Sequence, residues 1–318
     1  MAKGWRERAV GTWRHDALGV WMFVWCYAPM VAALALFHRY PNVGTFFLAM
    51  AVVAFRMNAL FVVTHESWHF NVFRSRAANQ WLGAALASYP IVMPYFKDRT
   101  THWDHHRYVG TPRDPDAWAW DYKDGEQRKL ARDLLAVASG TPYLIRIARI
   151  IVGRPAPGQG RPGSAITKGE IARIILVHLV ILGIFWRTIG AFWYVPLWLF
   201  PGLALFPVVT IVREFLEHRR GAIIIYPRAN VLERFLLGCF NFHLHGYHHA
   251  FASAPWFTLP DMDERARRRV KEMVTLESYF GELVAYARGR SPAFRGRGDE
   301  TEVRDAGDQS IDERKDED

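Results

Sequence analysis

The chain has 318 residues, of which 51% are hydrophobic, 14% aromatic and 22% charged, a composition that excludes a chain disordered throughout. Its only cysteines, Cys26 and Cys239, cannot build a disulfide scaffold or a thiolate metal site. The net charge of +9 hides a more basic body, because residues 299–318 hold ten acidic and three basic side chains. A basic body suits an anionic partner such as a phospholipid surface, nucleic acid or an acidic carrier.

Four stretches are long and apolar enough to cross a membrane. They form two pairs, and the second pair is joined by the short link Arg187-Thr188, which predicts a tight helical hairpin. Arg56 is the single charge in the second stretch, so it would snorkel or face protein. The predicted spans are residues 19–37, 42–63, 171–186 and 189–212.

The intervening segments do not have the character of simple spans. Segment 81–96 is apolar but carries two prolines, which favours a re-entrant or interfacial element over a fifth full span. Segment 143–154 mixes Ile and Leu with Arg at helical spacing, which is typical of an amphipathic helix on the inner leaflet. Segment 154–164 is rich in Gly and Pro and predicts a linker.

The distribution of Lys and Arg predicts the orientation in the membrane. Segment 97–168 carries thirteen basic residues, whereas each link within a pair of spans carries one. The positive-inside rule then places both termini and the central segment in the cytoplasm. We expect a cytoplasmic segment over 1–18, a membrane domain over 19–290 and a disordered acidic tail over 291–318, with the first span retained rather than cleaved.

Nine of the thirteen histidines fall into four groups, HESWH, HWDHH, a single His after the fourth span, and HGYHH. Spacings of three and four residues bring side chains to one face of a helix. Imidazole suits iron, zinc, copper and nickel, and nine ligands are too many for one zinc but suit two metal ions with four or five each. The candidate ligands are His65, His69, His102, His105, His106, His218, His245, His248 and His249.

The topology favours convergence of these groups, because two spans separate the second group from the third and return the chain to the same side. Carboxylates beside the groups could orient the imidazoles, or they could be ordinary solvated or capping charges. The candidates are Glu66, Asp104 and Glu217. Asn241, four residues before His245, could be a further ligand or supporting group, or simply a polar helix residue. The remaining histidines, expected to be structural, are His15, His38, His178 and His243.

Two alternatives use the same residues differently. HESWH matches the H-E-x-x-H motif of zinc proteases, in which the Glu is a general base, but this reading leaves seven histidines unexplained. A metal transporter or sensor would place ionisable residues within its spans. The predicted spans hold only Arg56, Arg173 and His178, which disfavours this class.

The pattern H-x3-H, H-x2-H-H and H-x2-H-H around two hairpins resembles the membrane fatty acid desaturase superfamily, which also holds hydroxylases and ketolases. The resemblance covers roughly residues 20–285. Two departures are Glu66, where many members have Asp, and His245, where the front-end desaturases have Gln. His218 resembles the additional ligand after the fourth span. Other matching positions are Gly110, Asp114, Pro115, Asp116, Pro255, Trp256, Leu259 and Pro260.

The resemblance implies an all-α integral membrane protein with a cytoplasmic histidine-rich cap that holds two iron ions and uses O2 as co-substrate. The implied reaction is desaturation of a lipid or fatty acyl substrate, with hydroxylation or ketone formation on a lipid, carotenoid or alkyl chain as the alternative. No fused electron-transfer domain is visible, so electrons would come from a separate ferredoxin- or cytochrome b5-like donor. We expect no nucleic acid partner.

The substrate would lie in an apolar tunnel walled by the spans and segment 81–96. Trp68, Trp103 and Trp256 either line this tunnel or form an aromatic belt at the membrane interface. Basic residues near its mouth could hold an anionic head group.

Overall fold

The computed structural model describes residues 3–120, 122–123, 125–151, 166–219, 225–262 and 274–290. This part of the chain is mostly helical. Two three-residue strands, β1 (Ile225–Pro227) and β2 (Val274–Leu276), pair in parallel and join two distant segments. The predicted linker over 154–164 and the acidic tail over 291–318 lie outside the described residues.

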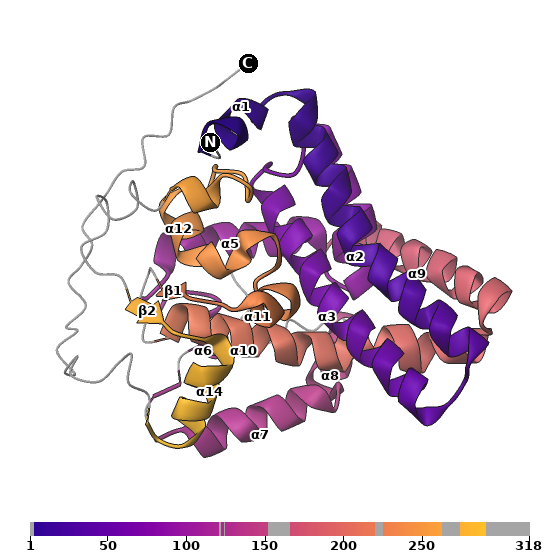
Figure 1. Cartoon of the computed structure of the whole chain (residues 1–318). Coiled ribbons are helices and arrows are strands. Elements are labelled where there is room, and N and C mark those ends of the chain that lie inside the picture. The colour runs from indigo at the N-terminus through magenta and orange to yellow at the C-terminus, as the bar shows by residue number, and fades with distance from the viewer. Residues whose placement is uncertain are drawn as a thin grey trace.

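Four helices of the described part are long and apolar enough to cross a membrane, which confirms the prediction of an all-α protein with four candidate spans. The first pair is α2 (Trp13–Arg39) and α3 (Val43–Trp68), which lie side by side (Figure 1). The second pair is α9 (Lys168–Thr188) and the segment Ala191–His218, called here the fourth span. The fourth span consists of η3 (Ala191–Trp193), η4 (Val195–Leu199), η5 (Pro201–Leu205) and α10 (Phe206–His218).

The helix boundaries differ from the predicted spans, and two of the differences bear on the first histidine group and on the second hairpin. Helix α3 does not stop at 63 but continues through the first histidine group to Trp68. The second hairpin does not turn at Arg187-Thr188, which complete α9; it turns at Gly190, whose φ is +103°. Glycine adopts this conformation without the penalty that a Cβ brings, so the turn occurs there.

Segment 81–96 is a broken helix and is not one of the four candidate spans. It comprises the end of α4 (Arg76–Gly83), then η1 (Ala84–Ser88) and η2 (Tyr89–Ile91). The chain turns at Val92, whose φ is +60°, and α5 (Tyr95–Tyr108) begins after Pro94. The two prolines therefore divide the segment, as the sequence indicated, and the alternative of a fifth full span is wrong.

The remaining helices form a cap at the end of the bundle where α3 and α10 finish, and Figure 1 shows α5 and α12 there. A separate core of buried aromatic and aliphatic side chains, including Phe215 and Tyr279, packs α10 against this cap. The other cap helices are α6 (Ala117–Trp120), α7 (Gln127–Ala138), α8 (Thr141–Ile151), α11 (Val231–Leu236), η7 (Cys239–Leu244), α12 (His245–Ala250), η8 (Leu259–Asp261) and α14 (Tyr279–Ala287); α1 (Lys3–Ala9) precedes α2.

The bundle core lies between α2, α3 and the fourth span, and it includes Met22, Met57 and Leu197. The opposite faces of α2 and α9 expose large apolar side chains such as Val31 and Leu176. Exposed apolar faces of this length are typical of helices in contact with lipid. The chain after α3 crosses close to Gly19, where an added Cβ would lie 2.4 Å from the Val72 carbonyl oxygen, so the crossing requires glycine.

Candidate metal centre

The structure brings all nine candidate histidines together in two sets. The first, called the five-histidine set, contains His65, His69, His102, His106 and His248. The second, called the four-histidine set, contains His105, His218, His245 and His249. Within each set, one ring nitrogen from every residue lies within 4.8 Å of the others. The set sizes agree with the sequence expectation of four or five ligands for each ion.

Each of the two H-x2-H-H groups divides between the sets. In α5, His102 and His106 belong to the five-histidine set, whereas His105 belongs to the four-histidine set. In α12 the first and fifth residues of the group join the four-histidine set and His248 joins the five-histidine set. On a helix, the side chains at positions i and i+4 project in nearly the same direction. The side chain at position i+3 projects to the other side of the side chain at position i. The sequence expectation that all three would act on one shared face was therefore too simple.

The other two contributing helices end at the same place. His65 lies in the last turn of α3 and His69 is its C-terminal cap, while His218 is the last residue of α10. The ring centroids of His105 and His218 are 4.9 Å apart, although two candidate spans separate them in the sequence. The structure thus brings together histidine groups that are distant in the sequence, as expected.

The nitrogen positions of the five-histidine set fit a bound metal ion. His102 Nε2 lies 2.8 Å from His69 Nε2 and 3.0 Å from His106 Nε2. A neutral imidazole has one N–H, so hydrogen bonds cannot account for both contacts fully. Two nitrogens bound to one ion at roughly 2.1 Å and at right angles lie about 3.0 Å apart. The buried Nε2 atoms of His65 and His248 have no hydrogen-bond partner among the described residues.

The four-histidine set shows the same arrangement. His245 Nε2 lies 3.1 Å from His218 Nε2 and 3.0 Å from His249 Nε2. The Nε2 atoms of three imidazoles therefore lie close together, as the ligands of a single cation do.

Burial keeps most of these imidazoles neutral, which is the form that binds metal. Removal from water lowers the pKa of His69 to about 3. It also lowers the pKa of His102 and His106 well below the ordinary value, and neighbouring imidazoles add to the effect. The same holds for the three histidines of α12, whose pKa values burial lowers well below the ordinary value.

His105 differs because it has a carboxylate partner. Its Nδ1 lies 2.8 Å from Asp114 Oδ1 and 3.8 Å from Asp116 Oδ2. Burial alone would lower the pKa of His105, but the hydrogen bond with Asp114 and the nearby negative charges outweigh it and raise the pKa to about 9. The contact also fixes the ring with Nδ1–H toward Asp114, which leaves Nε2 for the four-histidine set. Sequence reasoning noted Asp114 in a motif but did not include it among the supporting groups.

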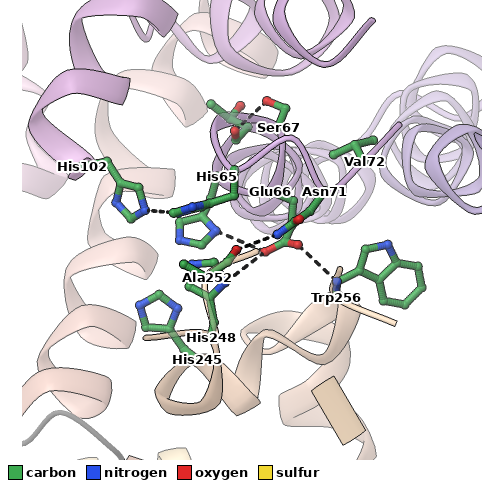
Figure 2. Close-up of polar contacts among 12 residues, drawn as sticks. His65, Glu66, Ser67, Asn71, Val72, His102, His245, His248, Ala252 and Trp256 are labelled. Atoms are coloured by element: carbon green, nitrogen blue, oxygen red, sulfur yellow. Dashed lines mark hydrogen bonds and ion pairs between the residues drawn. The ribbon is translucent and has the colours of Figure 1, made fainter. Parts of the chain in front are cut away.

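Glu66 lies where a supporting carboxylate was expected. Its Oε1 is 3.3 Å from His65 Nδ1 and 3.9 Å from His248 Nδ1, and its Oε2 accepts the backbone N–H of Trp256 at 3.2 Å (Figure 2). Glu66 thus contacts one imidazole from the first histidine group and one from the last. Glu66 is buried and both of its carboxylate oxygens make these contacts. The general base of a zinc protease must instead be exposed to a peptide substrate.

Of the other three supporting candidates, Glu217 and Asn241 make different contacts, and the structure leaves the role of Asp104 open. Glu217 forms an ion pair with Arg213 and accepts the Tyr279 hydroxyl at 2.7 Å, so it supports the packing of α10 rather than an imidazole. On the same helix it is Glu214 that approaches a candidate ligand, with Oε2 4.0 Å from His218 Nε2. Asp104 is half-buried and lines the cavity described below.

The helical relationship assumed for Asn241 is wrong. Its φ is +59°, and the helix that carries the last histidine group begins only at His245. The Asn241 side chain instead donates to the Trp256 carbonyl at 3.2 Å. Its role is to hold the turn before the last histidine group.

The remaining four histidines lie outside both sets, as expected. His15 Nε2 contacts the Asn71 carbonyl oxygen at 2.8 Å. His243 Nδ1 lies 3.4 Å from the Gly238 carbonyl oxygen, and His38 is exposed at the end of α2. His178, in the second hairpin, lies 2.6 Å from the Tyr194 hydroxyl.

A cavity of about 1,630 Å³ opens beside the two sets. His65, His102, His105 and His245 form part of its wall, together with Trp68. Away from the histidines the wall is apolar and is formed by the fourth span and one face of α9, including Ile171, Ile174, Ile175, Leu179, Leu182, Leu203 and Phe206. Basic side chains line another part of the wall, namely Lys97, Arg113, Arg146, Arg149 and Lys168.

This geometry defines a class of protein, a helical bundle with four candidate membrane spans and two adjoining histidine sets at one end. The sequence profile described as "Fatty acid desaturase" matches residues 41–280, most of the chain. The chain belongs to the fatty acid desaturase family.

Curated relatives include enzymes with different reactions. The chain is 29% identical over 153 residues to an sn-1 acyl-lipid omega-3 desaturase (ferredoxin) of Synechocystis sp., a match over 45% of this chain and 40% of that protein. It is 27% identical over 209 residues to a beta-carotene ketolase of Paracoccus sp., a match over 63% of this chain and 72% of that protein. A zeaxanthin 4-ketolase of Chlamydomonas reinhardtii is 28% identical over 105 residues, 31% of this chain and 24% of that protein. The chain therefore covers less than half of the first and third of these relatives.

Proposed function

We propose that this protein is an O2-dependent di-iron oxidoreductase that desaturates the acyl chain of a lipid or fatty acyl substrate. The observation that carries the proposal is the position of the apolar cavity, whose wall includes imidazoles of both histidine sets. A hydrocarbon chain in this cavity would lie next to the metal centre and away from water.

The two histidine sets are the proposed iron sites. The five-histidine set would hold one ion and the four-histidine set the other, with all nine imidazoles as ligands. Bound iron would supply the redox chemistry with O2 that an unactivated C–H bond requires, and that acid–base side chains cannot provide. Neutral imidazoles add no negative charge, so the ions would remain cationic.

The chain's own residues would orient the site and the substrate. Asp114 and Glu66 hold imidazole rings in fixed orientations, which matters because such partners control metal affinity and ligand position. The cavity wall selects which carbons lie beside the histidines. Desaturation takes one hydrogen from each of two neighbouring carbons and, with one O2, two electrons and two protons, yields two waters.

A second candidate is oxygenation of a lipid, carotenoid or alkyl chain by the same site. Two of the three relatives are carotenoid ketolases, and one of them matches over 63% of this chain, which is the observation that favours it. The same ligands serve both reactions, so a displacement of the substrate by about 1 Å or less would decide between them. The zinc protease and transporter alternatives are not proposed, because family membership and two multi-imidazole sets account for the histidines that those alternatives left over.

Two further parts of the proposal concern orientation and electrons. We place the termini and the histidine sets on the cytoplasmic side, because the central segment 97–168 carries most of the basic residues between the hairpins. A separate ferredoxin- or cytochrome b5-like protein would supply the two electrons. The name of the Synechocystis relative specifies ferredoxin for that enzyme.

The test is expression in a host of known lipid composition, with and without a carotenoid supply, followed by mass spectrometry of the lipids. Desaturation appears as products that lack two hydrogens, and oxygenation as products that gain oxygen. The control is His105→Ala, which removes one imidazole of the four-histidine set. If neither product class forms in membranes that contain iron-loaded protein and a reductase system, the proposal is wrong, and full turnover by the control would contradict the ligand assignment.

A further inference from the structure

Helix α11 (Val231–Leu236) presents an apolar face with no protein cover among the described residues. Val231 is 85% exposed, Leu232 59% and Phe235 39%. These positions lie on one side of the helix, since i, i+1 and i+4 fall within about 100° of one another. Such a face on a short cap helix calls for a partner of apolar character.

The amino-terminal end of α11 is closed by side chains. The Asn230 side chain accepts the backbone N–H of Glu233 at 3.0 Å, and the Glu233 carboxylate accepts the backbone N–H of Asn230 at 3.0 Å. The other Glu233 oxygen accepts the backbone N–H of Phe280 at 2.9 Å. Glu233 itself is fully buried, so water does not take part in this cap.

The carboxyl-terminal end of α11 is closed by two side chains of α3. The Arg56 guanidinium donates to the carbonyl oxygen of Phe235. The Asn58 amide lies 3.2 Å from the carbonyl oxygen of Leu236 and 3.4 Å from that of Leu237. The unpaired backbone groups of a helix end are satisfied by side chains or by water, and in hydrocarbon only the protein can satisfy them. At both ends of α11 side chains make such contacts, so the helix is compatible with a position in hydrocarbon.

The contact with Arg56 fixes the level of α11 along the bundle. Arg56 is thirteen residues after the first residue of α3, which corresponds to about 20 Å along the helix. The hydrocarbon layer of a bilayer is about 30 Å thick. The end of α11 therefore reaches α3 at a point that lies within the membrane thickness if α3 enters the layer near Val43.

The apolar face of α11 continues the exposed apolar face of α2. The Phe235 ring lies 5.7 Å from the Trp25 ring, and the Trp25 ring lies 5.9 Å from that of Trp21. Trp21 and Val24 of α2 are both exposed large hydrophobic residues on a candidate span. The two helices thus form one apolar surface.

We infer that α11 lies in the bilayer as a short helix parallel to the membrane plane, with Val231, Leu232 and Phe235 against lipid hydrocarbon. Arg56 and Asn58 anchor it from α3. Arg234 is exposed on the side of α11, and its Nε–H donates to the Ala229 carbonyl oxygen at 2.8 Å. We place the helix roughly 5–10 Å below the boundary, the depth of interfacial helices, where an exposed arginine lies within reach of the head groups. The segment that carries the last histidine group follows directly, so this part of the metal centre rests on the bilayer. The inference does not depend on which reaction the centre performs.

The test measures the membrane depth of a spin label at position 232. Leu232→Cys is reconstituted in phospholipid vesicles and compared with Val31→Cys on α2 and Arg228→Cys before α11. These three residues have similar exposure, at 59%, 62% and, for the Arg228 side chain, 63%. The native cysteines are both buried, so unmutated protein gives the background labelling.

We expect the label at 232 to resemble the label at 31, with collisions with O2 several-fold more frequent, relative to a water-soluble nickel chelate, than at 228. A label at 232 that behaves like the label at 228 overturns the inference. So does a label protected from both reagents that broadens with protein concentration, because a second copy of the chain would then cover the face. Arg56→Gln tests the anchor: in protein that elutes normally on gel filtration, it should raise nickel access at 232, and unchanged access would remove Arg56 from the inference.

Discussion

Glu66 and Trp256 are 190 residues apart in the sequence, yet the backbone N–H of Trp256 donates to Glu66 Oε2 at 3.2 Å. The other oxygen of the same carboxylate faces the imidazoles of His65 and His248. One buried carboxylate therefore joins the first histidine group to the segment after the last. Its position ties the geometry of the metal centre to the packing of the cap against α3.

Glu66→Gln tests this connection. The amide oxygen can still accept the Trp256 N–H, so the fold should persist, but the amide no longer supplies a negative charge beside the imidazoles. Loss of such a partner typically lowers metal affinity or activity about 10- to 100-fold. Iron content after dialysis against a graded chelator series measures the effect. A variant that retains iron like the native protein would assign Glu66 a packing role alone.

Asp114→Asn should weaken the four-histidine set more than Asp116→Asn. Asp114 lies 2.8 Å from His105 Nδ1, whereas Asp116 lies 3.8 Å away. We expect a loss of about 10- to 100-fold in metal affinity for the first variant, because a neutral amide replaces the charged hydrogen-bond acceptor of His105 and holds the ring less firmly. The second variant is the matched control and should change much less. Equal losses would show that negative charge near His105, rather than its hydrogen bond, is what matters.

Leu179→Trp should reduce turnover or shift the site of reaction along the substrate. Leu179 lines the cavity, so a larger side chain there would displace the hydrocarbon chain, and a displacement of about 1 Å can cost on the order of 100-fold in rate. Leu176→Trp is the control, because Leu176 is equally exposed on α9 but is absent from the cavity wall. Product analysis of both variants in the same host checks the prediction. Native product from Leu179→Trp would show that the substrate lies elsewhere.

Metal-free protein should lose stability as the pH falls below about 6.5. Burial lowers the pKa of His243 to about 4, whereas in the unfolded chain it titrates near 6.5. Between these values the unfolded chain binds more protons, so the stability present above pH 6.5 decreases on acidification, by about 2 kcal/mol for this residue at pH 5. Thermal unfolding of chelator-treated protein at pH 7.5 and 5 measures the change. His243→Asn, which can still donate to the Gly238 carbonyl, should show a smaller decrease, and an identical decrease would assign the effect to other histidines.

The sequence by itself determined the membrane-length helices and the candidate metal ligands of this protein. Apolar runs of about twenty residues, each with at most one charge, specify helices that suit a bilayer, and their number and pairing were read correctly. Eight of the nine candidate histidines lie at spacings of three and four, and this pattern predicts a metal site, because imidazole side chains at these spacings project from a helix in nearby directions. Prolines in segment 81–96 also indicated correctly that it would not be a continuous span.

Only the tertiary structure decided which histidines belong to which set and which carboxylates lie beside them. Spacing fixes the angle between His102 and His105 on α5 but not which neighbouring helix faces each of them, so their assignment to different sets follows from packing. Packing also decides that Asp114 is the hydrogen-bond partner of His105, whereas Glu217 pairs with Arg213. Asn241 is not in the predicted helix, because its backbone takes a positive φ and its side chain contacts the distant Trp256 carbonyl. Local periodicity sets directions along one helix, and contacts between distant segments set which groups meet.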